Sequence, residues 1–131
     1  MIVGRFGETG ELFFDIELIA ANDDCFAVEA LLDTGFTTGW LAINSQDIDA
    51  LEWSLISSEI EMKTARGEEL FDIYEGKVII DRQEFTIPVH VGEGLPDILI
   101  GSQWLDSMEL IVKKRKGILI LEVLENEFNM I

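Results

Sequence analysis

The 131-residue sequence is poor in the residue types that build disulfides and metal sites, with one cysteine and one histidine. The single cysteine, Cys25, excludes an internal disulfide and a cysteine-based zinc site. Several histidines would be needed for a histidine-rich metal site, and His90 stands alone. We therefore expect no metal ion and no other cofactor, and we expect Cys25 to be a small buried residue of a strand.

Basic residues are also scarce, because 9 lysines and arginines face 26 acidic residues and give a formal net charge of −17. A chain with this charge repels nucleic-acid phosphates and anionic lipids, so we expect neither nucleic acid nor a membrane as a partner. The one basic run, Lys113–Lys116, is interpreted as a solvated hairpin tip.

Long apolar runs are missing, since no segment approaches the roughly 18 uninterrupted apolar residues of a membrane span. Residues 1–10 include Arg5 and Glu8 and do not resemble a signal peptide. Together with the single cysteine, these features predict a cytoplasmic protein. The length predicts one domain over residues 1–131, and a hydrophobic content of 48% is sufficient for a folded core.

The apolar residues that are present follow the period of β-strands. Leu12, Phe14, Ile16 and Leu18 fall on one face of a predicted strand over 11–20. The turn signal at Asn22–Asp24 and a strand over 25–32 complete a hairpin. Further strands are predicted over 40–43, 59–64, 70–74, 77–80, 85–91, 97–101, 109–112 and 118–124, with short helices over 47–53 and 102–108. Many short, regularly spaced strands predict an all-β barrel or sandwich.

The segment richest in chemical information is Leu31–Gly35, in which an apolar strand ends in Asp-Thr-Gly. A carboxylate at this position is flanked by buried backbone and requires hydrogen bonds. Thr34 can donate from its hydroxyl group, and Gly35 permits a tight turn with an uncovered N–H. A β-turn in which Asp33 only caps backbone amides explains the same three residues, so the wider context matters.

That context resembles the retropepsin-like aspartic proteases. The family pattern is two apolar residues, then Asp-Thr-Gly, then an apolar strand. Here Leu31–Gly35 matches the first two parts, and Trp40–Ile43 matches the strand. A second family mark, an apolar strand ending in glycine before a short helix, resembles Asp97–Leu105, and Met62–Leu70 is similar to the flap hairpin between them. The resemblance covers a motif-bearing core of about residues 12–121. It implies a closed or partly open barrel of the retropepsin or acid protease type with one or two short helices.

The resemblance also implies a reaction. Aspartic proteases use two carboxyl groups about one hydrogen bond apart, which share one proton and activate a water. Because the sequence has a single Asp-Thr-Gly, Asp33 of two protomers would meet on a twofold axis. The implied protein is an aspartic endopeptidase that acts as a homodimer on a peptide or protein substrate. Thr34 would bond across the axis, and the Gly35 backbone would hold the carboxylates coplanar.

The flap implies a second group of site residues, which would cover an extended peptide and pair with its backbone. These substrate-binding residues are Thr64, Ala65, Arg66 and Gly67. Apolar side pockets are expected from Trp40, Ile100 and the flap. The sequence departs from the family at Phe36, where a small residue is common, and at Ser102, where an arginine often follows the glycine.

Other interpretations of the sequence stay open. The chain can be a non-catalytic all-β domain of the same fold that binds a peptide or protein, which the net charge of −17 and Phe36 favour. Alternatively, Asp-Thr-Gly is only a turn in a small ligand-binding barrel, which predicts a monomer. His90 in its predicted strand is interpreted as non-catalytic. Trp53 and Trp104 are interpreted as core or interface residues.

Overall fold

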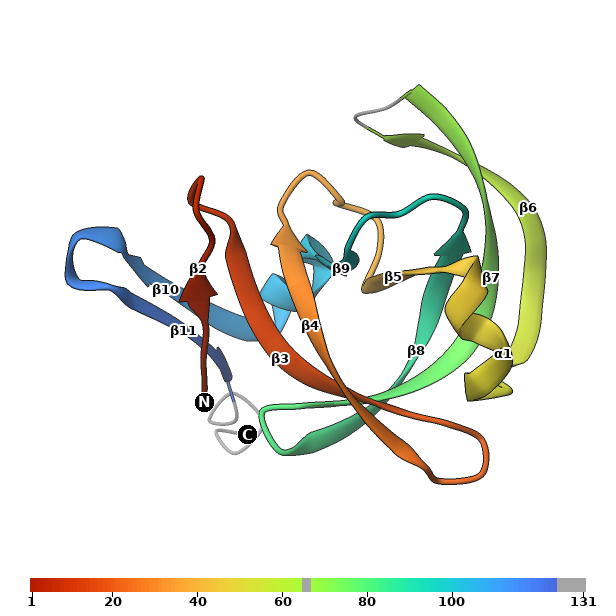
Figure 1. The fold of residues 1–131 in the computed structure, drawn as a ribbon, viewed down its shortest axis with the longest axis horizontal. Helices are drawn as coiled ribbons and strands as arrows, with labels where there is room; N and C mark the ends of the chain where they lie inside the picture. Colours follow the sequence, from red (N-terminus) through yellow and green to blue (C-terminus); the bar gives the residue numbers. More distant parts are fainter. Residues whose placement is uncertain (65–66, 125–131) are drawn as a thin grey trace, which may run out of the picture.

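The computed structural model describes residues 1–64 and 67–124, and most of its regular structure is β (Figure 1). The strands are β1 (Ile2–Val3), β2 (Arg5–Phe6), β3 (Leu12–Ile19), β4 (Cys25–Asp33), β5 (Leu41–Asn44), β6 (Ser54–Thr64), β7 (Gly67–Ile80), β8 (Gln83–Gly92), β9 (Ile98–Gly101), β10 (Met108–Lys113) and β11 (Ile118–Val123). The helical segments are the helix α1 (Ile48–Leu51) and the 3₁₀ helices η1 (Ser45–Asp47), η2 (Ser102–Asp106) and η3 (Lys114–Lys116). The predicted all-β class with short helices is confirmed.

Six strands form a closed ring of pairings in the order β3, β4, β9, β5, β8 and β7. The ring closes because Glu17–Ile19 of β3 pairs with Lys77–Ile79 of β7, while the length of β3 also pairs with β4. β9 runs parallel to β4, and β5 runs parallel to β8. Strand β6 extends beyond the ring as the outer arm of the β6–β7 hairpin (Figure 1).

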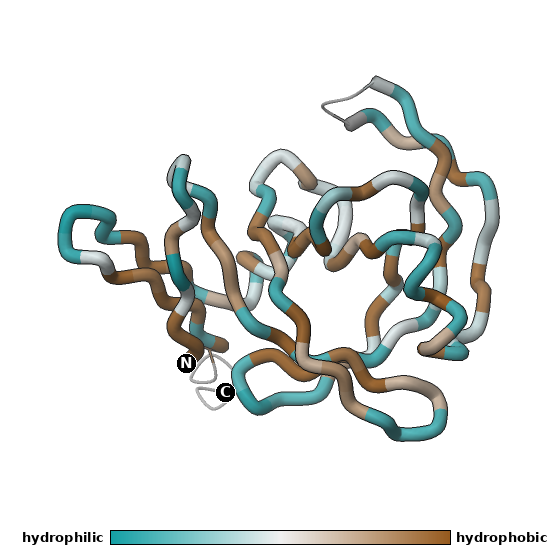
Figure 2. The backbone as a smooth tube through the Cα atoms, viewed as in Figure 1, coloured by the Kyte–Doolittle hydropathy of each residue, from teal (hydrophilic) through white to brown (hydrophobic). Residues whose placement is uncertain are grey.

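The barrel interior is filled by the residues that the period-two pattern predicts. Phe14, Ile16 and Leu18 of β3 are each at most 3% exposed, and they pack with apolar residues of β5, β8 and β9. Figure 2 shows apolar stretches along the barrel strands and hydrophilic residues at many of the turns. Trp53 and Trp104 are buried in this core, as expected.

A second, smaller sheet has the order β1, β11, β10. The predicted hairpin of β10 and β11 is confirmed, and its tip is the exposed basic segment η3. Leu119 and Leu121 of β11 are fully buried against the barrel core. The two-residue strands β1 and β2 were not predicted, because they are too short to show a period.

Two local expectations are wrong. β7 is one continuous strand and does not break at Gly76, because this glycine lets β7 approach Trp53 and Val89, where a Cβ would collide. Cys25 is exposed, because the first residues of β4 belong to a hairpin end that is exposed to solvent. The structure also shows how β8 accommodates Pro88, because the pairing with β5 begins only at Val89 and needs no N–H from the proline.

Among the described residues, no helix is long and apolar enough to cross a membrane. Within residues 1–64 and 67–124, no cluster of three or more His, Cys, Asp or Glu side chains is arranged to hold a metal ion.

Candidate active site

Asp33 is the last residue of β4, and its position follows from the strand that precedes it. Ala30 and Leu32 are buried in the core, so the apolar run of β4 carries Asp33 to the rim of the barrel. There Asp33 pairs in parallel register with Gly101, the last residue of β9. The aspartate is half-buried, whereas Thr34 and Gly35 after it are exposed.

The Asp33 side chain organises the turn that follows it. Its Oδ1 accepts a hydrogen bond from the Gly35 N–H at 2.9 Å, and the Phe36 N–H donates to the Asp33 backbone oxygen at 3.1 Å. Among the described residues, Asp33 Oδ2 makes no hydrogen bond. One carboxylate oxygen therefore fixes the loop, and the other is free for a further partner.

The rest of the loop is held by β9 and η2, which lie beside it. The Ser102 N–H donates to the Phe36 oxygen at 2.9 Å, and the Ser102 hydroxyl approaches the same oxygen at 3.4 Å. The Gly101 N–H and the Trp104 Nε1–H both donate to the Trp40 oxygen, at 2.9 and 2.7 Å. Gly101 is the N-cap residue of η2, and Ser102, the first residue of η2, fixes the Asp33 loop.

Two glycines allow the loop to lie directly against β9. A Cβ on Gly101 would collide with the backbone oxygen of Gly39, and a Cβ on Gly39 would overlap the Phe36 ring. Phe36 is half-buried and packs on a small apolar cluster of Ala42, Phe71 and Leu95. The bulky residue next to Asp-Thr-Gly is therefore directed toward the cluster and is part of the packing that holds the loop.

The predicted flap corresponds to the β6–β7 hairpin, whose tip lies at the same end of the molecule as the Asp33 loop (Figure 1). Thr64 and Gly67 form the last pair of this hairpin, and Gly67 has a φ of 103°. The other two predicted flap residues, Ala65 and Arg66, lie outside the described residues. Register shifts near Glu59 bend β6, and Asp72 Oδ1 accepts the Glu59 N–H at 3.0 Å.

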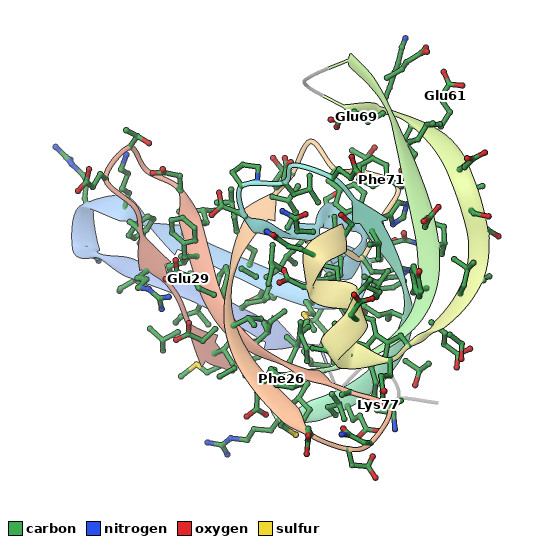
Figure 3. All side chains as sticks on the ribbon, turned by 45° about the vertical axis from the view of Figure 1, so that its right-hand side comes forward. Phe26, Glu29, Glu61, Glu69, Phe71 and Lys77 are labelled. Carbon is green, nitrogen blue, oxygen red and sulfur yellow. The ribbon has the colours of Figure 1, made fainter. Side chains whose placement is uncertain are left out.

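The flap hairpin is acidic on its exposed surfaces. Figure 3 shows Glu61 and Glu69 on its arms, with Phe71 lower on β7 near the barrel. A hydrogen bond to Glu68 raises the pKa of Glu61 above 4.5, because one of two neighbouring carboxyl groups favours its protonated form. Among its described residues the hairpin thus has more acidic than basic side chains.

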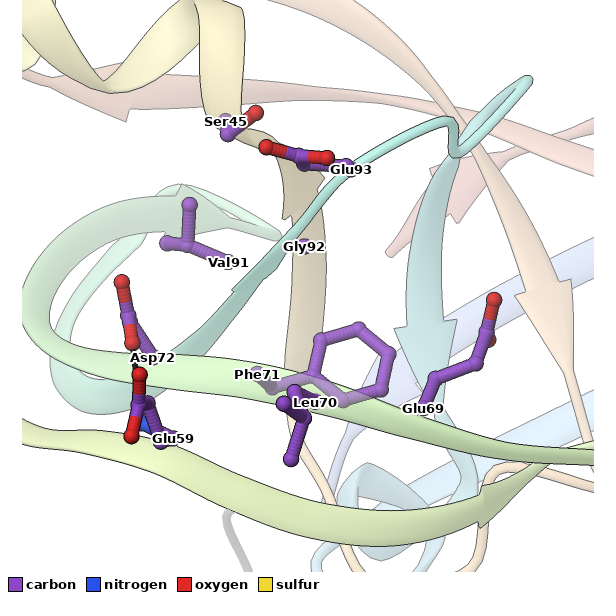
Figure 4. A pocket seen from close by; sticks show the side chains of 9 residues that line it. All are labelled: Ser45, Glu59, Glu69, Leu70, Phe71, Asp72, Val91, Gly92 and Glu93. Atoms are coloured by element: carbon purple, nitrogen blue, oxygen red, sulfur yellow. Dashed lines mark hydrogen bonds between the residues drawn. The ribbon is translucent and has the colours of Figure 1, made fainter.

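A cavity of about 520 Å³ opens at the base of the flap hairpin, and Asp33 does not line it (Figure 4). Its lining residues are Ser45, Glu59, Glu69, Leu70, Phe71, Asp72, Val91, Gly92 and Glu93. The expected side pockets are also corrected, because Ile100 is fully buried in the core and cannot contact a substrate. The Trp40 ring is half-buried and packs edge-on against Trp104 at 4.8 Å.

A single-lobe barrel with Asp-Thr-Gly at the end of β4, a glycine-ended β9 beside it and a hairpin at the same end defines a retropepsin-like fold. Comparison with solved structures agrees. A retropepsin-like aspartic protease from Rickettsia conorii matches with a TM-score of 0.60 and 19% identity, over 93% of this chain and 89% of that chain. The EIAV protease in complex with the inhibitor HBY-793 matches with a TM-score of 0.61 and 14% identity, over 82% and 98%.

The protein therefore has the retropepsin-like fold that its motifs predict. No protein-family model and no curated protein matches the sequence. At these identities the likeness concerns the fold, and the assignment of an activity depends on the site.

Proposed function

We propose that the protein is an aspartic endopeptidase that is active as a homodimer. The observation that carries this proposal is the Asp33 carboxylate at the rim of a retropepsin-like barrel, with one oxygen fixed by Gly35 and the other without a hydrogen bond from any described residue. The proposed substrate is an extended segment of a peptide or protein, as strand addition beneath a hairpin requires.

The dimer follows from the number of catalytic groups. The reaction needs two carboxyl groups that share one proton, and the sequence supplies one Asp-Thr-Gly per chain. A twofold contact brings a residue on the axis against its own copy, so two Asp33 side chains can form the pair. In this arrangement each protomer contributes half of the substrate cleft, so the cleft is incomplete in one chain. The cavity at the base of the flap hairpin is not that cleft, because Asp33 does not line it.

In the proposed mechanism each part of the loop has a defined task. The ionised Asp33 takes a proton from water, which attacks the peptide carbonyl, and the neutral Asp33 donates to the carbonyl oxygen. The two aspartates titrate as a pair. Thr34, exposed beside the aspartate, is proposed to bond across the axis, and Gly35 keeps the carboxylate in the plane of the turn.

The test uses chains in which the shared pair is broken without disturbing the loop. In Asp33→Asn the amide oxygen can still accept the Gly35 N–H, so the variant is expected to fold like the wild type. When the variant is mixed in excess with wild-type chains, activity per wild-type chain should fall as mixed dimers form. Activity that stays constant while mixed dimers are detected would contradict the shared pair.

A second candidate is a non-catalytic domain of the same fold that binds a peptide or protein. It is favoured by the ring of Phe36 next to Asp33 and by the net charge of −17, which suits a basic partner. A peptide isostere with a hydroxyl group in place of the scissile carbonyl distinguishes the two functions. A protease binds it and loses this binding in Asp33→Asn, whereas a binding domain treats both chains alike and cleaves no peptide.

A further inference from the structure

His90 of β8 is the one buried polar or charged residue among the described residues, with 7% of its surface exposed. Its Nδ1 atom is buried and has no hydrogen-bond partner in this part of the chain. A buried polar atom without a partner is costly and therefore uncommon in folded proteins. The proposed mechanism does not use His90, so its position calls for another explanation.

The imidazole ring lies between the two parts of the candidate site. It contacts the Phe36 ring edge-on, with centroids 5.1 Å apart, and the Phe71 ring in a similar way at 5.8 Å. Phe36 belongs to the Asp33 loop, whereas Phe71 belongs to β7, the inner arm of the flap hairpin. In the sheet, His90 pairs with Ile73 of β7 and with Ala42 of β5.

We propose that His90 is a positioning residue that holds the Asp33 loop and the flap strand in one arrangement while it is neutral, and that releases them when it is protonated. The neutral ring suits an apolar site between two phenyl rings. In the tautomer with its proton on Nε2, protonation adds an N–H at Nδ1, where no acceptor is available among the described residues.

No charged group contributes to the shift in the pKa of His90. The charged residues on the neighbouring strands and loop are Asp33 of β4, Glu68, Glu69, Asp72, Glu75 and Lys77 of β7, Glu84 of β8, and Glu93 and Asp97 before β9. Asp72 and Tyr74 alternate to the other face of β7. Burial lowers the pKa of His90 below 6.5, and burial is the sole cause of this shift. Attraction between a cation and a phenyl face acts in the opposite direction, so a measured pKa decides which effect is larger.

The first test needs no variant of His90, because the sequence has a single histidine and its ring gives one set of NMR signals. We expect its pKa to lie below 6.5 and the amides of Phe36 and Phe71 to change with the same midpoint. The experiment is repeated in Asp33→Asn, where the catalytic carboxylate no longer titrates. A pKa above 6.5, or loop and flap amides that do not follow the ring, would overturn the proposal.

His90→Phe is the matched variant, because it keeps an aromatic ring between Phe36 and Phe71 and cannot be protonated. The folded-state pKa of His90 lies below 6.5, so the unfolded chain binds the proton more readily, and wild-type stability should fall as the pH drops through this window. In His90→Phe this component of the pH dependence and the shared titration of the Phe36 and Phe71 amides should be lost. A variant that keeps them contradicts the proposal.

The role in catalysis rests on the proposed function, and the two can fail separately. If the protein is a protease, the acid limb of its pH profile should move to lower pH in His90→Phe. An unchanged acid limb would overturn the role of His90 in an active enzyme. If no peptide is cleaved but the amide signals of Phe36 and Phe71 follow the titration of the His90 ring, the proposed function fails and the coupling by His90 stands.

Discussion

The Asp33 loop and the flap hairpin lie at the same end of the barrel but are held in different ways. The loop is fixed by hydrogen bonds from β9 and η2 to the backbone oxygens of Phe36 and Trp40. The hairpin, by contrast, has four large apolar side chains that are between 40% and 60% exposed. They are Leu55, Ile56, Ile60 and Leu70. Its pairing also contains register shifts, and two of its carboxyl groups share a hydrogen bond.

The difference shows how one small domain combines a rigid part with a part that can open at low cost. Segments with few buried apolar contacts have low free energies of local opening, whereas a loop tied to the core opens only with the core. In the proposed function the rigid loop holds Asp33 in place, and the hairpin admits and covers an extended peptide.

The largest expected effect comes from comparing two glycines, one in each region. Gly101→Ala should lower the free energy of unfolding by more than about 3 kcal/mol, because its Cβ meets the rigid backbone of Gly39. Gly67→Ala should cost about 1 kcal/mol, since its φ is positive but the space around it is open. Chemical denaturation of both variants measures the difference, and equal losses would mean that loop and flap are equally restrained.

The next effect concerns an apolar side chain from each region. Phe36→Ala removes a half-buried ring that packs on His90 and on the cluster of Ala42, Phe71 and Leu95, so we expect a loss of about 2 kcal/mol. Leu70→Ala on the hairpin is the control, because 60% of its surface is exposed and its loss should stay within about 0.5 kcal/mol. Thermal unfolding tests both, and a larger loss for Leu70→Ala would reverse the comparison.

Much of the barrel could be predicted from sequence because its signals are local. The alternation along β3 marks the buried face, and the turn before β4 uses Asp23, whose φ is 71°. The turn at Asp33 could also be predicted from sequence, because a carboxylate and a glycine two residues apart form it within one short segment. These features depend on spacings of a few residues.

The parts that sequence reasoning missed depend on contacts between distant segments. Ser102 contacts the backbone oxygen of Phe36, which lies 66 positions earlier in the sequence. Its role in holding the loop is therefore not visible in the sequence near Asp33. Gly76 suggests a break between two strands in the sequence, whereas in the structure it allows the close approach of Trp53 and Val89. A glycine needed for a turn and a glycine needed for packing look the same until the neighbouring segment is known.

A smaller effect separates the two bonds that Ser102 makes to the loop. Ser102→Ala removes the 3.4 Å hydroxyl contact to the Phe36 oxygen but keeps the backbone N–H bond, so we expect a loss of about 0.5 kcal/mol. Ser107→Ala is matched, because its hydroxyl approaches the Trp104 oxygen at the same distance. Amide spectra should show changes at Gly35 and Phe36 only in Ser102→Ala. Shifts of the same size in both variants would mean that the hydroxyl does not act on the loop.

The smallest expected effect lies in the titration of the flap hairpin. Glu61 has a raised pKa because it shares a hydrogen bond with Glu68, so the folded state binds a proton more tightly than the unfolded chain just above pH 4.5. As the pH rises through this window, the hairpin should lose the bond and open more readily. In Glu68→Gln the pKa of the Glu61 carboxyl group should return toward 4.5, and hydrogen exchange of the hairpin amides should become less dependent on pH. Because the amides of the Asp33 loop lie outside this hairpin, a matching change in their exchange would show that the two regions do not open independently.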